Sequence, residues 1–237
     1  MALPKLGYPT FELELPSTGK TIKYRPFLVK EEKVLLMALE SKDEKQVVSA
    51  VKDLIKNCVI TRIKVDNLPS FDLEYLFLKI RGASIGENII LTVTCLDDNE
   101  TQVEANININ DVEIFKPEGH DKKIMFDENT GIVMKYPSMK EFVDREFLQK
   151  EMKTEDVYEF IADSIDQIFD SEEVYDSSTT TKKEFRTFVD NLTTKQFEKI
   201  QKFYETSPKL SHTFKVTNPK TNKESSYTIE GLQSFFA

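Results

Sequence analysis

Apolar and polar residues alternate in two short stretches near the start of the chain, residues 8–15 and 20–27. Alternation with a period of two is typical of strands that bury one face. Residues 16–19 read Pro-Ser-Thr-Gly and favour a tight turn. We therefore predict a β-hairpin, and Pro26, which lacks a backbone N–H, should end its second strand.

The apolar spacing then changes to three and four residues, which predicts helices over residues 29–41, 44–60 and 70–82. Ser70 is the expected N-cap of the third helix. Cys58 falls on the apolar side of the second helix and is most simply a small core residue. The expected buried faces consist of Val29, Leu35, Leu36 and Leu39, then Val47, Val51, Leu54 and Ile55, then Leu73, Leu76, Phe77 and Ile80.

Short β-type runs separated by turn-forming residues follow, so the middle of the chain is predicted to be rich in strands. The expected strands cover residues 89–93, 103–109, 112–115, 123–126 and 132–136.

Helical spacing returns over residues 138–206. Ser138, with Glu141 in a capping box, is expected to cap a helix over 139–149, and Thr154 is expected to cap the next one. We predict an exposed loop over residues 177–181, and Pro208 should stop the helical run. The expected buried stripes are Val157, Phe160, Ile161, Ile165 and Ile168, then Phe185, Phe188, Val189 and Leu192, then Phe197, Ile200 and Phe203.

Two further strand-like pieces, residues 211–217 and 225–229, flank a turn and predict a C-terminal hairpin. The predicted fold class is therefore α+β. Its expected sections are residues 1–86, with a hairpin and helices, 87–137, rich in strands, and 138–237, helical with a final hairpin. They would form one or two compact units.

Charge and composition exclude several classes of function. Residues 87–206 hold 14 Lys/Arg against 28 Asp/Glu, so they repel phosphate backbones, and nucleic acid is not an expected partner. No apolar stretch is long enough to span a membrane, and no signal peptide is visible. The two cysteines, Cys58 and Cys95, suggest no disulfide framework, which fits a reducing compartment such as the cytoplasm.

One segment matches the sequence pattern of a catalytic motif: residues 82–86 read Gly-Ala-Ser-Ile-Gly, which fits G-x-S-x-G. In a hydrolase this motif follows a strand and opens a helix. Here the predicted order is reversed, so the glycines indicate a helix C-cap and a turn. An esterase-like enzyme using Ser84 remains a remote alternative, with only His120 and His212 available as its base.

Candidate metal and cofactor sites are weak. The cysteines and histidines are isolated in sequence, whereas zinc sites favour close pairs, and no phosphate-binding loop is present. We expect no catalytic residue, no metal and no cofactor. A cluster of acidic residues is expected to be a solvated helix face rather than a calcium loop: Asp163, Asp166, Asp170, Glu172, Glu173 and Asp176.

Three blocks of the chain resemble the T4-type phage baseplate hub assembly proteins. They are residues 24–41, beginning Tyr-Arg-Pro-Phe, residues 68–87, beginning Leu-Pro-Ser-Phe, and a C-terminal pattern. The C-terminal pattern consists of Pro208, Lys209, Leu210, His212, Asn218, Pro219, Gly231, Leu232, Phe235 and Phe236.

The resemblance implies a protein without enzymatic activity that assembles the central baseplate hub in the host cytoplasm by binding other hub proteins. It acts as an assembly factor or chaperone, or as a permanent minor subunit of the hub and hence of the virion. No small-molecule substrate and no membrane partner are expected. The candidate partner-binding residues are Phe27, Leu28, Arg81, Leu232, Phe235 and Phe236. The alternatives are that the apolar residues close the protein's own core and that Arg81 pairs with Glu74.

Overall fold

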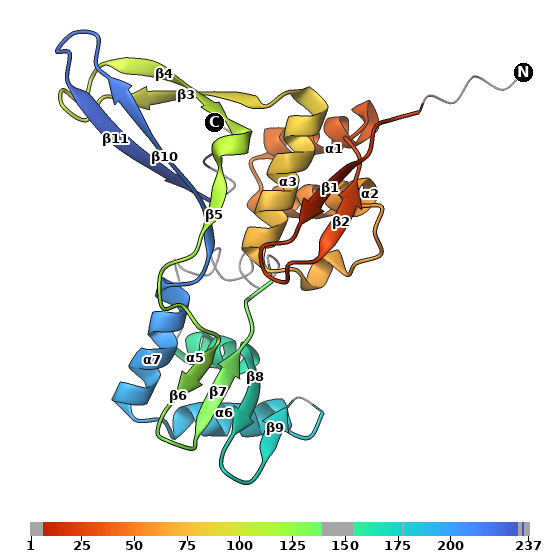
Figure 1. Ribbon diagram of the computed structural model, residues 1–237, viewed down its shortest axis with the longest axis vertical. Coiled ribbons are helices and arrows are strands. Elements are labelled where there is room, and N and C mark those ends of the chain that lie inside the picture. The colour runs from red at the N-terminus through yellow and green to blue at the C-terminus, as the bar shows by residue number, and fades with distance from the viewer. Residues whose placement is uncertain (1–6, 139–153, 177, 232–233, 235–237) are drawn as a thin grey trace, which may run out of the picture. The chain divides into compact units, whose positions relative to one another are not determined.

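A computed structural model describes residues 7–138, 154–176, 178–231 and 234. The chain forms two compact units, coloured along the chain in Figure 1. Unit 1 comprises residues 1–115 and 209–237, and unit 2 comprises residues 116–208. The fold is mixed α+β with small antiparallel sheets, so the predicted class is confirmed. The division into sections 1–86, 87–137 and 138–237 stays a prediction.

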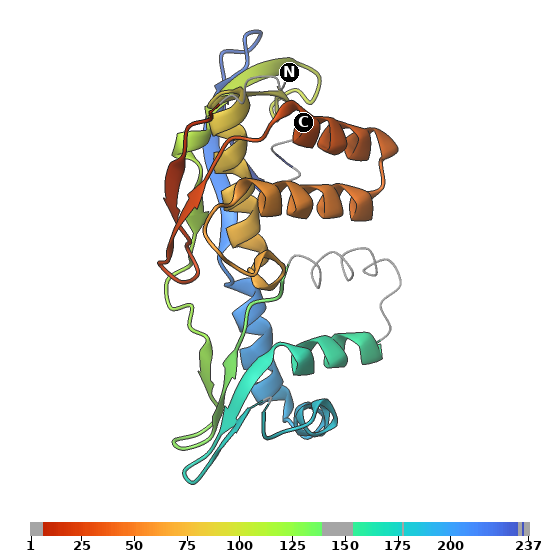
Figure 2. The same ribbon diagram turned by 90° about the vertical axis from the view of Figure 1, so that its right-hand side faces the viewer.

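Unit 1 begins with the predicted hairpin, formed by β1 (Phe11–Glu14) and β2 (Thr21–Tyr24). Gly19 lies in its turn at a φ of 67°, which favours glycine. Three helices follow, and the predictions of all three are confirmed: α1 (Val29–Ser41), α2 (Glu44–Cys58) and α3 (Ser70–Ile85). A 3-10 turn, η1 (Val65–Asn67), precedes α3. Helices α1 and α2 pack side by side, and α2 packs on α3 (Figure 2).

The predicted buried face of α1 is partly wrong. Leu35 is buried as expected, but Val29 and Leu36 are exposed. Glu31 and Ala38 take the remaining inward positions of the helix. Because Glu31 lies on the buried side of α1, the inward face of this helix differs from the one that the apolar pattern predicts.

The start of α3 also differs from the prediction. Pro69, in an extended conformation, occupies the N-cap position, and Ser70 is the first helical residue. Proline disfavours the helical conformation for the residue before it, so the chain stays extended until Pro69. The predicted buried face, by contrast, is confirmed, because Leu73, Leu76, Phe77 and Ile80 are all buried.

The strands of unit 1 form two further sheets, and the predicted strands are confirmed. β3 (Asn88–Thr94) pairs with β4 (Gln102–Asn108). After η2 (Ile109–Asp111), β5 (Glu113–Phe115) joins the C-terminal hairpin of β10 (Lys209–Thr217) and β11 (Glu224–Glu230), in the order β11-β10-β5. Their core against α3 consists of Leu78, Ile89, Leu91, Ile107, Ile109, Val112 and Leu210.

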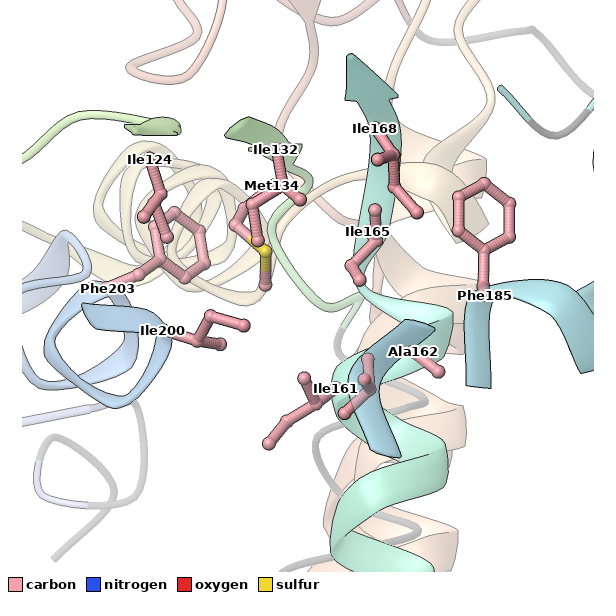
Figure 3. Close-up of a cluster of buried hydrophobic side chains, with 11 residues drawn as sticks. Ile124, Ile132, Met134, Ile161, Ala162, Ile165, Ile168, Phe185, Ile200 and Phe203 are labelled. Atoms are coloured by element: carbon pink, nitrogen blue, oxygen red, sulfur yellow. The ribbon is translucent and has the colours of Figure 1, made fainter. Parts of the chain in front are cut away.

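Unit 2 has a four-stranded antiparallel sheet, ordered β6-β7-β8-β9, packed with α5 (Thr154–Asp163), α6 (Lys182–Asp190) and α7 (Thr194–Glu205). The strands are β6 (Lys123–Met125), β7 (Gly131–Met134), β8 (Ile165–Phe169) and β9 (Val174–Asp176). Figure 3 shows apolar side chains from the strands and from the helices meeting in one core. Its centre includes Ile132, Met134, Ile161, Ile165, Ile200 and Phe203.

The prediction that Ile165 and Ile168 continue a helical stripe is wrong, because both belong to β8. The β7–β8 register shifts between Val133 and Met134: Val133 pairs with Gln167, and Met134 pairs with Ile165. This bulge leaves one extra residue in β8, so side chains three apart share the buried face. A bulged strand thus imitates helical spacing in the sequence.

The acidic cluster is solvated but is not a helix face, so that prediction is corrected too. Asp166 lies in β8, and Asp170 accepts hydrogen bonds from the backbone N–H groups of Glu172 and Glu173 in the β8–β9 turn. Asp176 ends β9 and accepts a hydrogen bond from the backbone N–H of Ser178 in the next turn.

The last two helices of unit 2 confirm their predicted faces. Each begins with a capping box, Thr181 with Glu184 and Thr193 with Gln196. Phe185, Val189, Ile200 and Phe203 are buried. The predicted helix over 139–149 lies outside the described residues, as does Ser177 of the expected loop; residues 178–180 form a turn.

Candidate partner-binding surface

The first resembling block forms a buried ion pair where β2 turns into α1. Arg25 and Glu31 are both buried, and the Arg25 Nη2 to Glu31 Oε1 distance is 3.1 Å. The Leu28 backbone N–H donates to Glu31 Oε2 at 2.6 Å, so the same carboxylate holds the first turn of α1. Burial raises the pKa of Glu31, but the hydrogen bonds from Arg25 and Leu28 outweigh it, and the pKa is lowered overall.

Cys58 lies beside this pair, with its Sγ 3.8 Å from Arg25 Nη1. Burial raises the pKa of the Cys58 thiol to about 11, although Arg25 opposes the shift. The thiol is therefore protonated at neutral pH and unreactive, as expected for a small core residue.

Ser84, the serine of the hydrolase-like motif, connects α3 to the segment between β2 and α1. Its Oγ donates to the Ile80 carbonyl at 2.6 Å and accepts from the Phe27 backbone N–H at 2.9 Å. The motif lies at the end of α3, and Gly86 is the C-cap at a φ of 113°, so the predicted order of helix before strand is confirmed. The Ser84 hydroxyl is thus used to join two segments of unit 1.

Asp72 forms a third set of polar contacts between segments of unit 1. The carboxylate is fully buried in the first turn of α3 and accepts hydrogen bonds from the Ser17 backbone N–H, at 3.0 Å, and from the Ser17 hydroxyl. It thereby fixes the β1–β2 turn against α3. No local pattern predicts this pair, because the two residues are 55 positions apart.

The other face of α1 carries large apolar side chains that point into solvent. We call Leu28, Val29, Val34, Leu36 and Met37 the α1 surface. Val29 is 79% exposed, Met37 60% and Leu36 53%. Exposed Lys30, Lys33 and Glu40 lie among them. Contiguous exposed apolar side chains with a polar rim are typical of protein-binding surfaces.

The six residues predicted to bind a partner are placed differently by the fold. Leu28 belongs to the α1 surface, whereas Phe27 is only 9% exposed and belongs to the core of unit 1. Leu232, Phe235 and Phe236 lie outside the described residues. Val29 and Leu36 were expected to be buried, but the burial of Glu31 on α1 leaves both of them exposed. Val34 and Met37 lay outside the predicted buried face but were not predicted to bind a partner.

Arg81 is partly buried in α3, and its Nη1 atom is buried without a hydrogen-bond partner in the described part of the chain. Burial lowers the pKa of Arg81. The expected pairing inside the fold therefore does not satisfy this nitrogen. A buried donor without an acceptor is costly, so this nitrogen destabilises the fold of unit 1.

The C-terminal block joins the tips of two hairpins in unit 1. The side-chain amide of buried Asn218, in the β10–β11 turn, donates to Asp97 Oδ1 at 2.9 Å and to Asp98 Oδ2 at 3.0 Å. Thr221 also donates to Asp97, and Cys95 is a free, buried thiol close by in sequence. These hydrogen bonds satisfy the buried amide.

The two histidines also have structural partners. His120, in unit 2, lies 2.9 Å from Thr206 Oγ1 through Nδ1 and 2.8 Å from the Tyr136 hydroxyl through Nε2. His212 lies 3.2 Å from the Asp111 carbonyl oxygen. Among residues 7–138, 154–176, 178–231 and 234, no group of three or more His, Cys, Asp or Glu side chains could hold a metal ion.

The exposed apolar side chains of the α1 surface are typical of the class of proteins that bind other proteins. A family model described as T4 bacteriophage base plate protein matches residues 8–237, which covers both units. The chain therefore belongs to the T4 bacteriophage base plate protein family, and membership implies binding to other baseplate proteins. No curated protein and no solved structure matches the chain significantly. None of the described helices is long and apolar enough to cross a membrane.

Proposed function

We propose that this baseplate protein is an assembly factor for the central hub and that it holds a hub protein on the α1 surface. The observation that carries the proposal is the outward face of α1, where Val29, Leu36 and Met37 are all more than half exposed. An assembly factor needs such a surface, because it must cover an apolar region of its partner until the final neighbour replaces it.

The contacts around the start of α1 support this role. The Arg25–Glu31 pair fixes the start of α1, and Ser84 holds the backbone of Phe27. A helix anchored in this way presents its outer side chains without reorganisation, and pre-organisation lowers the entropic cost of binding. No chemical step is involved, which agrees with the use of the Ser84 hydroxyl as a structural tie.

Co-purification from phage-infected cells tests the proposal. Leu36→Glu places a charge within the α1 surface, so we expect recovery of baseplate proteins with the tagged chain to fall at least tenfold. Ile90→Glu is the matched control, because Ile90 is 60% exposed on β3, in the same unit. Equal recovery with wild type and Leu36→Glu would show that the α1 surface does not hold the partner.

The alternative role, a permanent minor subunit of the hub, is supported by the family description, which specifies a baseplate protein without an assembly step. Quantitative mass spectrometry of purified particles separates the two roles. An assembly factor gives no stoichiometric signal in finished particles. A constant number of copies per baseplate would contradict the assembly role while leaving the α1 surface as its interface.

A further inference from the structure

The charges on the outer side of α1 are arranged so that the helix can pair with a second copy of itself. Lys30, Lys33, Met37 and Glu40 follow one another at spacings of three, four and three residues, so they form one stripe along the helix. All four are exposed. The two lysines lie in the N-terminal half, and the glutamate lies in the C-terminal half.

An antiparallel two-fold pairing matches this stripe to itself. With the axis at the level of Leu35 on the exposed side of the helix, Lys30 of one copy lies opposite Glu40 of the other, and Lys33 lies opposite Met37. Leu36 then meets Leu36 of the other copy on one side of the axis, and Val34 meets Val34 on the other side. A two-fold interface requires a self-complementary surface, and both the charges and the apolar residues of this helix meet that condition. A parallel pairing would instead place lysine against lysine.

We propose that two copies of this chain pair through antiparallel α1 helices and cover each other's α1 surface before the hub partner binds. This pairing rests on the proposed function in one respect: the second copy and the hub protein would bind the same α1 surface. Each would therefore exclude the other. Self-association would then keep the apolar side chains of unengaged copies out of water.

The size of α1 sets the strength of this pairing. A helix of 13 residues is about 20 Å long. One pair of such helices covers much less than the roughly 800 Å² per partner of a standard interface. We therefore expect a weak dimer, with a dissociation constant on the order of 100 µM, so that a larger interface with the hub protein can replace the second copy.

Charge reversal in the full-length chain tests the orientation directly. Lys30 and Glu40 are about 15 Å apart along one helix, so they cannot contact each other within a copy. Sedimentation equilibrium should show dimerisation of the wild type that weakens about tenfold in Lys30→Glu and in Glu40→Lys, because each reversal opposes like charges twice. The double variant Lys30→Glu/Glu40→Lys should restore the wild-type constant to within about twofold.

Two outcomes would overturn the pairing: a monomer at every concentration up to about 1 mM, or a dimer that the double variant fails to restore after the single reversals. Circular dichroism of each variant checks that the exposed substitutions leave the fold intact. Co-purification of baseplate proteins is scored separately. A monomer that still recovers hub proteins contradicts only the dimer, whereas a restored dimer without hub recovery contradicts only the proposed function.

Discussion

The helices of the two units use their apolar residues in different ways. In unit 2, α6 and α7 direct Phe185, Val189, Ile200 and Phe203 into one core, and Val174 is the one large apolar side chain classed as exposed in its described part. In unit 1, α1 buries a glutamate and turns Val29, Leu36 and Met37 outward. The same residue types therefore form the core of unit 2 and an exposed surface on α1 of unit 1.

The two units also differ in their buried polar side chains. Unit 1 has two buried carboxylates that bind residues outside their own helices: Glu31 pairs with Arg25, and Asp72 binds Ser17. The described core of unit 2 is apolar and aromatic, with His120 stacked on Tyr136 and Phe203. We therefore expect unit 1 to be sensitive to the loss of single charges and unit 2 to the loss of apolar volume.

The largest effect is expected for the buried pair of unit 1. Glu31→Leu leaves Arg25 as an uncompensated buried charge and should lower the free energy of unfolding by about 3–5 kcal/mol. Arg25→Met/Glu31→Leu removes both charges and should cost less than the single change. Hydrogen exchange of β2 and α1 amides measures both variants. A double variant less stable than Glu31→Leu would contradict the role of the ion pair.

A comparable loss is expected from apolar volume in unit 2. Ile200→Ala removes a fully buried side chain from α7 and should cost about 2–5 kcal/mol, through lost burial and the cavity left behind. Hydrogen exchange should rise in peptides of β6, β7 and α7. Peptides of α1 and α3 serve as the internal control, and an equal rise there would mean that the two units unfold together.

A smaller effect is expected from pH in unit 2. Thr206 Oγ1 donates to the Lys202 carbonyl, so it accepts from His120 Nδ1, and Nε2 accepts from Tyr136 in the neutral ring. Burial lowers the pKa of His120, and Lys116 and Lys122 lower it further. The unfolded chain then binds more protons, so this contribution is complete above about pH 6.5 and is lost as the pH falls below it.

Thermal unfolding of wild type and His120→Gln between pH 8 and pH 5 measures that contribution. The difference in stability between the two proteins should shrink as the pH falls. A difference that stays constant over this range would mean that His120 does not titrate with folding.

The smallest change in stability is expected for Arg81→Met. The buried Nη1 lacks an acceptor in the described part of unit 1, so removal of the guanidinium should leave stability within about 1 kcal/mol of the wild type or raise it. If Arg81 anchors a partner carboxylate, recovery of baseplate proteins should fall at the same time. A large loss of stability would instead show that Arg81 is satisfied inside the fold.

Local patterns were enough to predict most elements of the fold. The hairpin of β1 and β2, helices α1 to α3 and the C-terminal hairpin follow from spacing and turn residues, because each depends on neighbours in sequence. The errors arose where distant residues decide the outcome. The bulge between Val133 and Met134 makes β8 resemble a helix, and only its pairing with β7 reveals it.

The candidate surface was predictable only in part. Leu28 could be identified from its position at the start of α1, but Val29 and Leu36 could not. Their outward direction depends on the burial of Glu31, which depends in turn on Arg25 in the preceding strand segment. A charged residue at an inward position is the opposite of what helical periodicity assumes.

Tail assembly in extracts measures whether the α1 surface is needed to build baseplates. Extracts of cells infected with phage that lack this protein receive the purified wild-type chain, Leu36→Glu or the matched Ile90→Glu, and completed baseplates are counted by electron microscopy. We expect wild type and Ile90→Glu to restore baseplates and Leu36→Glu to restore fewer than about one tenth as many. Full restoration by a folded Leu36→Glu protein would contradict this expectation.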